Sequence, residues 1–165
     1  TGFEVVGQYD FTDQWSFDFA FATSNPEFEN GTKWGQFVGI CDDVFCPADG
    51  EVGGRTLPRQ TKTQWALGAQ YETSLSNGLD FFARSDLTYQ SKRYVDAMNF
   101  AYAPERYLLS GSVGIQGDRW SVTAWGENLA DEKYVTSSLF IVQFNRYGPA
   151  VNDGRTYGVT AAFDF

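Results

Sequence analysis

Residues 154–165 read Gly-Arg-Thr-Tyr-Gly-Val-Thr-Ala-Ala-Phe-Asp-Phe, and this stretch decides the fold. Apolar side chains occupy the odd positions from Tyr157 to Phe165, and small or polar side chains occupy the even positions. Because side chains of a strand alternate between its two faces, the pattern predicts a strand with one apolar face. Its aromatic ending is typical of a membrane-embedded β-barrel, in which outward side chains meet lipid and aromatics lie at the interface.

The same alternation recurs in six earlier segments, at about residues 3–11, 15–22, 65–72, 79–90, 107–116 and 120–125. These segments predict an all-β chain of about seven antiparallel meander strands. Short turns alternate with longer connections, which cover approximately residues 23–63, 95–106 and 129–153. Bacterial outer-membrane barrels sort short turns to the periplasm and long loops to the outside, so we expect the three longer connections to be extracellular.

Large aromatics gather near the ends of the predicted strands. One group lies toward the short turns and comprises Trp15, Tyr71, Trp120, Phe163 and Phe165, and a second lies toward the long connections and comprises Trp65, Tyr89, Tyr107 and Tyr157. The opposite face carries the polar residues Glu4, Asp10, Asp18, Gln70, Glu72, Asp80, Arg84 and Asp86. We interpret the apolar face as facing lipid and the polar face as lining a lumen. The competing interpretation is a soluble β-barrel binding protein that buries the apolar face.

Composition narrows the function. Aromatics make up 18% of the 165 residues, yet the mean hydropathy is −0.35 and no apolar run is long enough for a transmembrane helix. The net charge of −9 argues against a nucleic-acid partner. Histidine is absent, and the acid pairs Asp42-Asp43 and Asp131-Glu132 lie in predicted loops without a cleft. We therefore predict no enzyme activity, no catalytic residues, no cofactor and no metal site.

The two cysteines, Cys41 and Cys46, lie close together in a polar segment. A local disulfide would fit an oxidising compartment. The alternatives are two free thiols or a weak half-site for zinc.

The strand count suggests a larger barrel. Single-chain bacterial barrels have an even number of strands, and a seven-stranded sheet would leave two unpaired edges in hydrocarbon. Either an eighth strand lies in residues 33–40, or the chain is the C-terminal part of a larger barrel. The absence of an initial Met and of a signal peptide favours the second expectation. The alternative is a complete small eight-stranded barrel with a structural or adhesion role.

Two motifs resemble a known family. Residues 128–134, Asn-Leu-Ala-Asp-Glu-Lys-Tyr, resemble the Asn-Leu-x-Asp-x-x-Tyr signature at the penultimate strand of TonB-dependent outer-membrane receptors. The ending that begins at Gly154-Arg155 resembles the final strand of the same receptors, although Asp153 replaces the usual proline. A weaker similarity is Leu57-Pro58-Arg59, which resembles a strand-entry motif that has lost its second proline.

The resemblance implies an outer-membrane receptor with a 22-stranded barrel and an N-terminal plug, which imports a scarce nutrient such as a ferric siderophore. Residues 1–165 would be an open fragment of that barrel, its C-terminal part, with the plug and the TonB box absent. The partners implied are outer-membrane lipid and lipopolysaccharide, the protein's own plug, the TonB–ExbB–ExbD complex, the barrel-assembly machinery and a small nutrient ligand. The assembly machinery would read Tyr157, Phe163 and Phe165 as its signal.

Candidate contact residues follow from the predicted positions. Aromatics of the extracellular loops would meet the ligand or pack loop against loop; they are Trp34, Phe37, Phe45, Phe100, Tyr102, Phe140, Phe144 and Tyr147. Polar residues of the lumenal face, Glu72, Arg84, Asp86 and Glu127, are expected to contact the plug or water.

Overall fold

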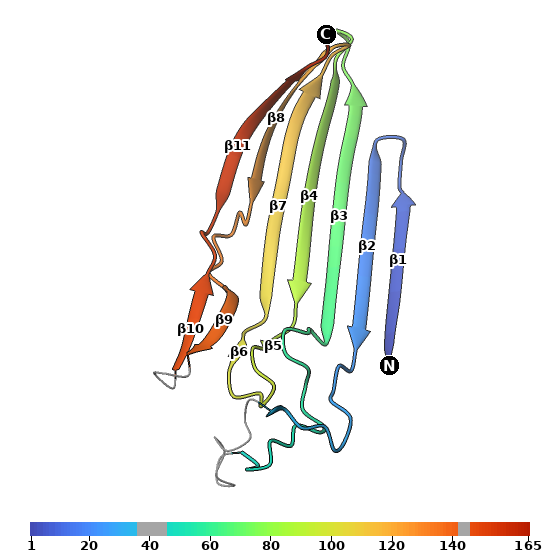
Figure 1. Cartoon of the computed structure of the whole chain (residues 1–165). Coiled ribbons are helices and arrows are strands. Elements are labelled where there is room, and N and C mark those ends of the chain that lie inside the picture. The colour runs from blue at the N-terminus through green and yellow to red at the C-terminus, as the bar shows by residue number, and fades with distance from the viewer. Residues whose placement is uncertain (36–45, 142–145) are drawn as a thin grey trace.

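Seven long strands form one antiparallel sheet in the computed structural model, which describes residues 1–35, 46–141 and 146–165 (Figure 1). The strands in sheet order are β1 (Gly2–Asp10), β2 (Trp15–Ser24), β3 (Thr63–Ser74), β4 (Asp80–Gln90), β7 (Arg106–Gln116), β8 (Trp120–Glu127) and β11 (Thr156–Phe163). Sequential neighbours pair throughout, so the predicted meander of seven strands is confirmed.

Local chemistry fixes the short turns. The Thr12 side chain accepts hydrogen bonds from the backbone N–H groups of Gln14 and Trp15, which closes the turn between β1 and β2. The Asn77-Gly78 pair closes the turn between β3 and β4, where Gly78 has a φ of 79° and the Asn77 side chain accepts from Leu79 N–H. These turns set the antiparallel register of the strands that they join.

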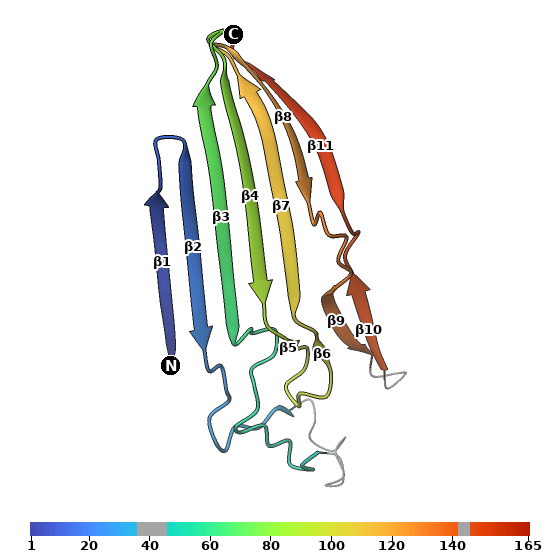
Figure 2. The same ribbon diagram turned by 180° about the vertical axis from the view of Figure 1, so that it is seen from behind.

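The sheet is open. Strands β1 and β11 lie at its opposite edges and do not pair with each other (Figure 2). The alternative of a small closed eight-stranded barrel therefore lacks the strand pairing that it requires. The possible eighth strand at residues 33–40 does not join this sheet through its described residues, 33–35. Lys33 forms an isolated bridge with Glu51, and residues 36–40 lie outside the described residues.

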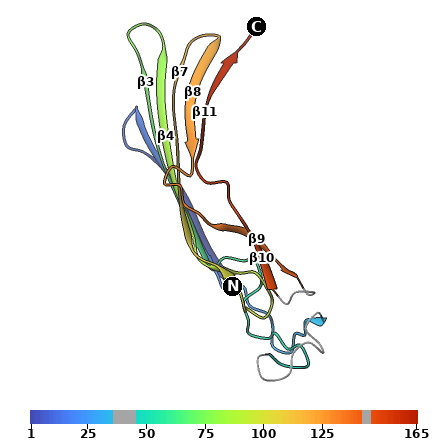
Figure 3. The same cartoon turned by 90° about the vertical axis from the view of Figure 1, so that its left-hand side faces the viewer.

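Two small hairpins within the long connections were missed by the sequence analysis. Strand β5 (Arg93–Tyr94) pairs with β6 (Tyr102–Ala103), and β9 (Val135–Ile141) pairs with β10 (Arg146–Val151). Figure 1 shows β5 and β6 beyond the ends of β4 and β7, and Figure 3 shows β9 and β10 beyond the ends of β8 and β11, so both hairpins lie at the end of the sheet opposite the short turns. Their strands are too short or too irregular in alternation to stand out from the surrounding loop sequence.

The apolar face of the sheet covers no core. Trp15, Phe17 and Phe19 are 42%, 41% and 43% exposed, and most of the other large exposed apolar side chains of the sheet lie on the same face, with Val6 and Trp125 on the opposite one. The buried apolar residues found in the described part of the chain, Val52, Ala97, Met98 and Ala103, all belong to the long connections. A soluble barrel would bury its aromatic face, so this arrangement favours the outward, lipid-facing interpretation.

Two bands of aromatic contacts border the apolar face. Near the long connections, Trp65, Tyr89 and Tyr107 of neighbouring strands contact one another, with ring centroids 4.8–6.2 Å apart. Near the short turns, Tyr71 contacts Trp15 at 4.9 Å and Phe81 at 6.2 Å. On β4 the bands lie eight residues apart, roughly 27 Å along the strand and about 21 Å across a bilayer at the usual tilt. This separation matches the apolar band expected of a barrel wall.

No helix in the described residues is long and apolar enough to cross a membrane.

Candidate functional site

A charge cluster lies on the polar face of the sheet, where β2, β3 and β4 run side by side. Arg84 pairs with Asp86 on its own strand and with Asp18 two strands away, at 2.5 Å and 3.0 Å. It also donates to the Gln70 side chain, and Gln70 in turn donates to Glu72. The sequence placed Arg84, Asp86 and Asp18 on the same polar face but did not indicate the link between Arg84 and Asp18.

The space for this cluster comes from a glycine. Gly68 pairs with Asp18 on one side and with Asp86 on the other. A Cβ atom at position 68 would lie 2.4 Å from an Asp18 carboxylate oxygen and 2.6 Å from an Arg84 nitrogen. The cluster contains one guanidinium and the three carboxylates of Asp18, Glu72 and Asp86, so it keeps an excess of negative charge.

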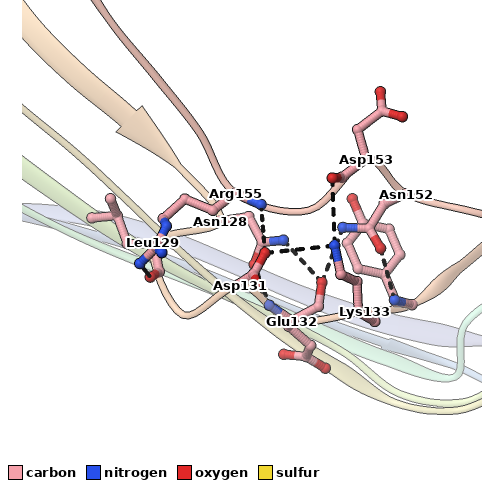
Figure 4. A network of polar contacts seen from close by, with 9 residues as sticks. Asn128, Leu129, Asp131, Glu132, Lys133, Asn152, Asp153 and Arg155 are labelled. Carbon is pink, nitrogen blue, oxygen red and sulfur yellow. Dashed lines mark hydrogen bonds and ion pairs between the residues drawn. The ribbon is translucent and has the colours of Figure 1, made fainter.

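The Asn-Leu-x-Asp-x-x-Tyr motif forms a compact hydrogen-bond network at the end of β8 (Figure 4). Asn128 is buried; its side chain accepts from Glu132 N–H and donates to Glu132 C=O, both at 2.9 Å. Asn128 and Asp131 have φ values of 50° and 54°, a conformation that asparagine and aspartate tolerate best among residues with side chains. The motif therefore determines the backbone path that leaves the sheet.

The same network holds the start of β11. The Asp131 side chain accepts from Arg155 N–H at 2.8 Å and pairs with Lys133 at 3.6 Å. The Arg155 N–H and the Lys133 charge together lower the pKa of Asp131. Gly154 between the two segments has a φ of 95°, and a Cβ atom there would lie within 2.6 Å of the Asp131 carboxylate. The two sequence motifs are thus one structural unit that joins β8 to β11.

The first two long connections share a small core. Val52 from the first packs against Ala97 and Met98 from the second, and Phe28 covers them. Asn99 joins the connections by donating to Thr56 C=O and accepting from Thr56 N–H, at 2.8 Å and 2.9 Å. The connections are therefore fixed against each other instead of forming independent loops.

The predicted ligand-contact aromatics have different positions. Trp34 packs edge-on against Phe28 at 5.7 Å, and Tyr102 packs against Tyr94 at 6.3 Å, so both take part in contacts within the loop region. Phe100 is 49% exposed. Tyr147 lies on β10, where burial and then the nearby Asp96 carboxylate raise its pKa. Phe37, Phe45 and Phe144 lie outside the described residues, as does the side chain of Phe140.

Cys46 is disulfide-bonded. The expected partner, Cys41, lies outside the described residues, so the pairing of the two remains a prediction. The half-site for zinc considered as an alternative does not fit an oxidised Cys46. Within the described residues, no group of three or more histidine, cysteine, aspartate or glutamate side chains could hold a metal ion.

Sequence reasoning missed a group of arginines beside the two small hairpins. Arg59, Arg93 and Arg106 come from three separate segments, and Arg59 and Arg93 line a pocket of about 200 Å³ together with residues of β9. In the sequence, Arg59 stands out only as part of the Leu57-Pro58-Arg59 motif, and Arg106 only marks the end of a predicted loop. No spacing in the sequence brings the three together, because their proximity depends on the folding of β5 onto β9.

Comparisons with known proteins support the fold. No protein-family model and no curated protein matches the chain. Among solved structures, the ferric yersiniabactin uptake receptor FyuA from Yersinia pestis is similar over 99% of this chain, with 21% identity and a TM-score of 0.82. The siderophore receptor PiuA and the ferric preacinetobactin receptor BauA, both from Acinetobacter baumannii, are similar over 97% and 99% of this chain, with 19% and 21% identity and TM-scores of 0.68 and 0.69.

The chain spans 23%, 21% and 22% of the length of FyuA, PiuA and BauA, respectively. The fold is thus that of a β-sheet segment found in siderophore receptors, and the resemblance drawn from the sequence motifs is confirmed at the level of the fold. These neighbours are named as receptors and none as an enzyme.

Proposed function

We propose that residues 1–165 form the C-terminal part of the barrel of a TonB-dependent outer-membrane receptor, which imports a scarce nutrient such as a ferric siderophore. The observation that carries this proposal is the open seven-stranded sheet with an outward apolar face between two aromatic bands. Its similarity to siderophore receptors along nearly the whole chain supports the same assignment. In this proposal β1 and β11 each pair with another strand of the complete barrel.

The sorting of connections supports an orientation. The short turns are at one end of the sheet, and the connections at approximately residues 23–63, 95–106 and 129–153 are at the other (Figure 1). We assign the second end to the outside of the cell. The polar face with Arg84 then lines the lumen, where a plug would supply the positive charge that balances Asp18, Glu72 and Asp86.

The test is iron uptake by the complete receptor. A strain that lacks the receptor gene is complemented with the wild-type gene, and uptake of ⁵⁵Fe is measured for a panel of ferric siderophores with and without TonB. Uptake of one complex that requires both the receptor and TonB is the expected result. Growth and uptake that are the same with and without the receptor for every complex would refute the proposal.

The terminal aromatics support an assembly role within the same proposal. Tyr157, Phe163 and Phe165 are 79%, 60% and 112% exposed, and β11 leaves its outer edge free for strand addition. Deletion of Phe165 is expected to slow barrel assembly and to spare receptors that have already folded. Heat-modifiable mobility after a pulse of synthesis measures this, and unchanged assembly kinetics would contradict the role.

A further inference from the structure

Three arginine side chains lie close together at the end of the sheet that carries the long connections. The chain carries 21 acidic residues against 12 basic ones, yet Arg59, Arg93 and Arg106 make no ion pair with any described residue. Two neighbouring acids in sequence are engaged elsewhere: Glu105, next to Arg106, accepts from the Tyr89 hydroxyl, and Asp96, three residues after Arg93, accepts from the N–H groups of Phe100 and Ala101. What sets these three guanidinium groups apart is that they lie close enough for the charges of Arg59 and Arg106 to act on Arg93, with no carboxylate paired to them among the described residues.

The three arginines are held close together. Arg93 donates to the backbone carbonyls of Val135 and Thr136, which fixes its position against β9. Arg106 donates to the Gln90 side chain at 2.7 Å and lies 4.2 Å above the Tyr134 ring. Burial lowers the pKa of Arg93, and the positive charges of Arg106 and Arg59 lower it further. Their mutual repulsion is a cost that a bound anion would remove.

The pocket beside them defines the size of the ligand group. It holds about 200 Å³ and is lined by Arg59, Arg93 and the hydroxyl-bearing residues 136–138. Complete small-molecule sites usually hold roughly 300–1,000 Å³, so this pocket suits one charged group of a larger ligand. Guanidinium forks and hydroxyl groups are the donors that recognise carboxylates and other oxyanions.

The register places the site on the lumenal side. Arg106 pairs with Gln90 in the β4–β7 ladder, two residues along the strand from Thr88 and four from Asp86, and so belongs to the polar face. A lipid phosphate would instead approach the apolar face, where Tyr89 and Tyr107 lie. We propose that Arg59, Arg93 and Arg106 form an anion-binding subsite at the mouth of the lumen, which receives a carboxylate or similar oxyanion of the imported ligand. The identity of that ligand rests on the function proposed above.

The test uses the complete receptor in nanodiscs that lack lipopolysaccharide, with citrate as the probe in calorimetric titrations at constant ionic strength. Arg59 is exposed and makes no side-chain hydrogen bond with a described residue, so Arg59→Gln should preserve the fold. We expect this change to weaken citrate binding roughly threefold, and the double change with Arg106→Gln to weaken it about tenfold or more. Arg119→Gln at the opposite end of the sheet removes the same charge and should leave citrate binding unchanged.

The outcomes separate the two proposals. Equal loss in the Arg119→Gln variant, or no loss in the double variant with native heat-modifiable mobility, would overturn the subsite. Loss of citrate binding when lipopolysaccharide is added to the nanodiscs would assign the arginines to a lipid phosphate and would also overturn it. If citrate binding depends on the arginines but no ferric complex is imported, the subsite stands and the proposed function fails. If the variants abolish citrate binding but import is unaffected, the proposed function stands and the role of the subsite in uptake is rejected.

Discussion

Leu87 and Thr88 are adjacent on β4, and the proposed barrel places them on opposite faces of its wall. Leu87 pairs with Leu67 and Leu109 on the apolar face, whereas Thr88 pairs with Ala66 and Leu108 on the polar face. Replacing each in turn with arginine introduces the same side chain at nearly the same depth. A shift of one residue along a strand moves a side chain to the other face, so the pair tests the orientation directly.

The cost follows from the depth of Leu87. It lies two residues from Tyr89 of the aromatic band, which is roughly 7 Å along the strand and about 5 Å below the interface. With about 10 Å from each band to the midplane, Leu87 lies halfway. Arginine on the lipid face costs about 2–4 kcal/mol at the midplane and about 0–1 kcal/mol near the interface. We therefore expect Leu87→Arg to lower the free energy of unfolding by about 2 kcal/mol, close to a 30-fold change in the folding equilibrium.

The assay is urea unfolding of the complete protein in phospholipid vesicles, followed by heat-modifiable mobility. Thr88→Arg should change the free energy of unfolding by no more than about 0.5 kcal/mol, because the lumenal face is polar and Asp86 lies on the same face. If Thr88→Arg is the more destabilising of the two changes, the assignment of the faces is wrong. Equal effects would show that neither side chain faces hydrocarbon.

Four further outcomes are expected. Asn128→Ala removes both hydrogen bonds to Glu132 and should lower the free energy of unfolding by about 1–3 kcal/mol in the same urea assay. The control Asn77→Ala, in an exposed turn, should have a much smaller effect, and equal effects would contradict the structural role of the motif. Gly154→Ala should lower the free energy of unfolding by about 1–3 kcal/mol, because Gly154 has a φ of 95° and the added carbon would meet the Asp131 carboxylate. The control Gly35→Ala, with no atom within 4 Å of the added carbon, should leave the stability unchanged. An unchanged stability of Gly154→Ala would show that this position is not strained. The folded-state pKa of Asp131 is lowered, so the stabilisation by its carboxylate is present above the unfolded pKa and is lost as the pH falls through the folded pKa. Asp131→Asn should therefore make the stability of the β8–β11 junction less dependent on pH below about pH 4. An unchanged acid profile would count against the network. In denatured, unreduced protein neither Cys46, which is disulfide-bonded, nor Cys41, its predicted partner, should react with an alkylating reagent when the labelled peptides are identified by mass spectrometry. Labelling of both cysteines would exclude the bond.

The long strands could be predicted from the sequence because their information is local. In β4, residues 80–90 alternate in polarity with few exceptions, and Asn77-Gly78 marks the turn before them. The open edge was also predictable, since an odd number of strands does not suit a bacterial barrel. In these strands, residues two positions apart lie on the same face, so the face of each side chain can be assigned from its immediate sequence neighbours.

The candidate sites were harder to predict because they depend on distant segments. Asp18 meets Arg84 through two strand registers, and Arg59 approaches Arg93 through the folding of a long connection. The β9–β10 hairpin contains Pro149 and a register shift at Ala150/Val151, which obscure its alternation. The motif at residues 128–134 was recognised as a signature, but only the contacts with Asn152 and Arg155 show that it works as a junction.

The small core formed by Val52, Ala97 and Met98 has a consequence for engineering. Loop grafting between receptors usually treats each surface loop as an exchangeable module. Here the first two long connections pack their apolar residues against each other and share the Asn99–Thr56 hydrogen bonds, so a loop transplanted alone would lose these contacts. A chimera that exchanges these connections should therefore take both segments together, with the boundaries placed in β2, β3, β4 and β7.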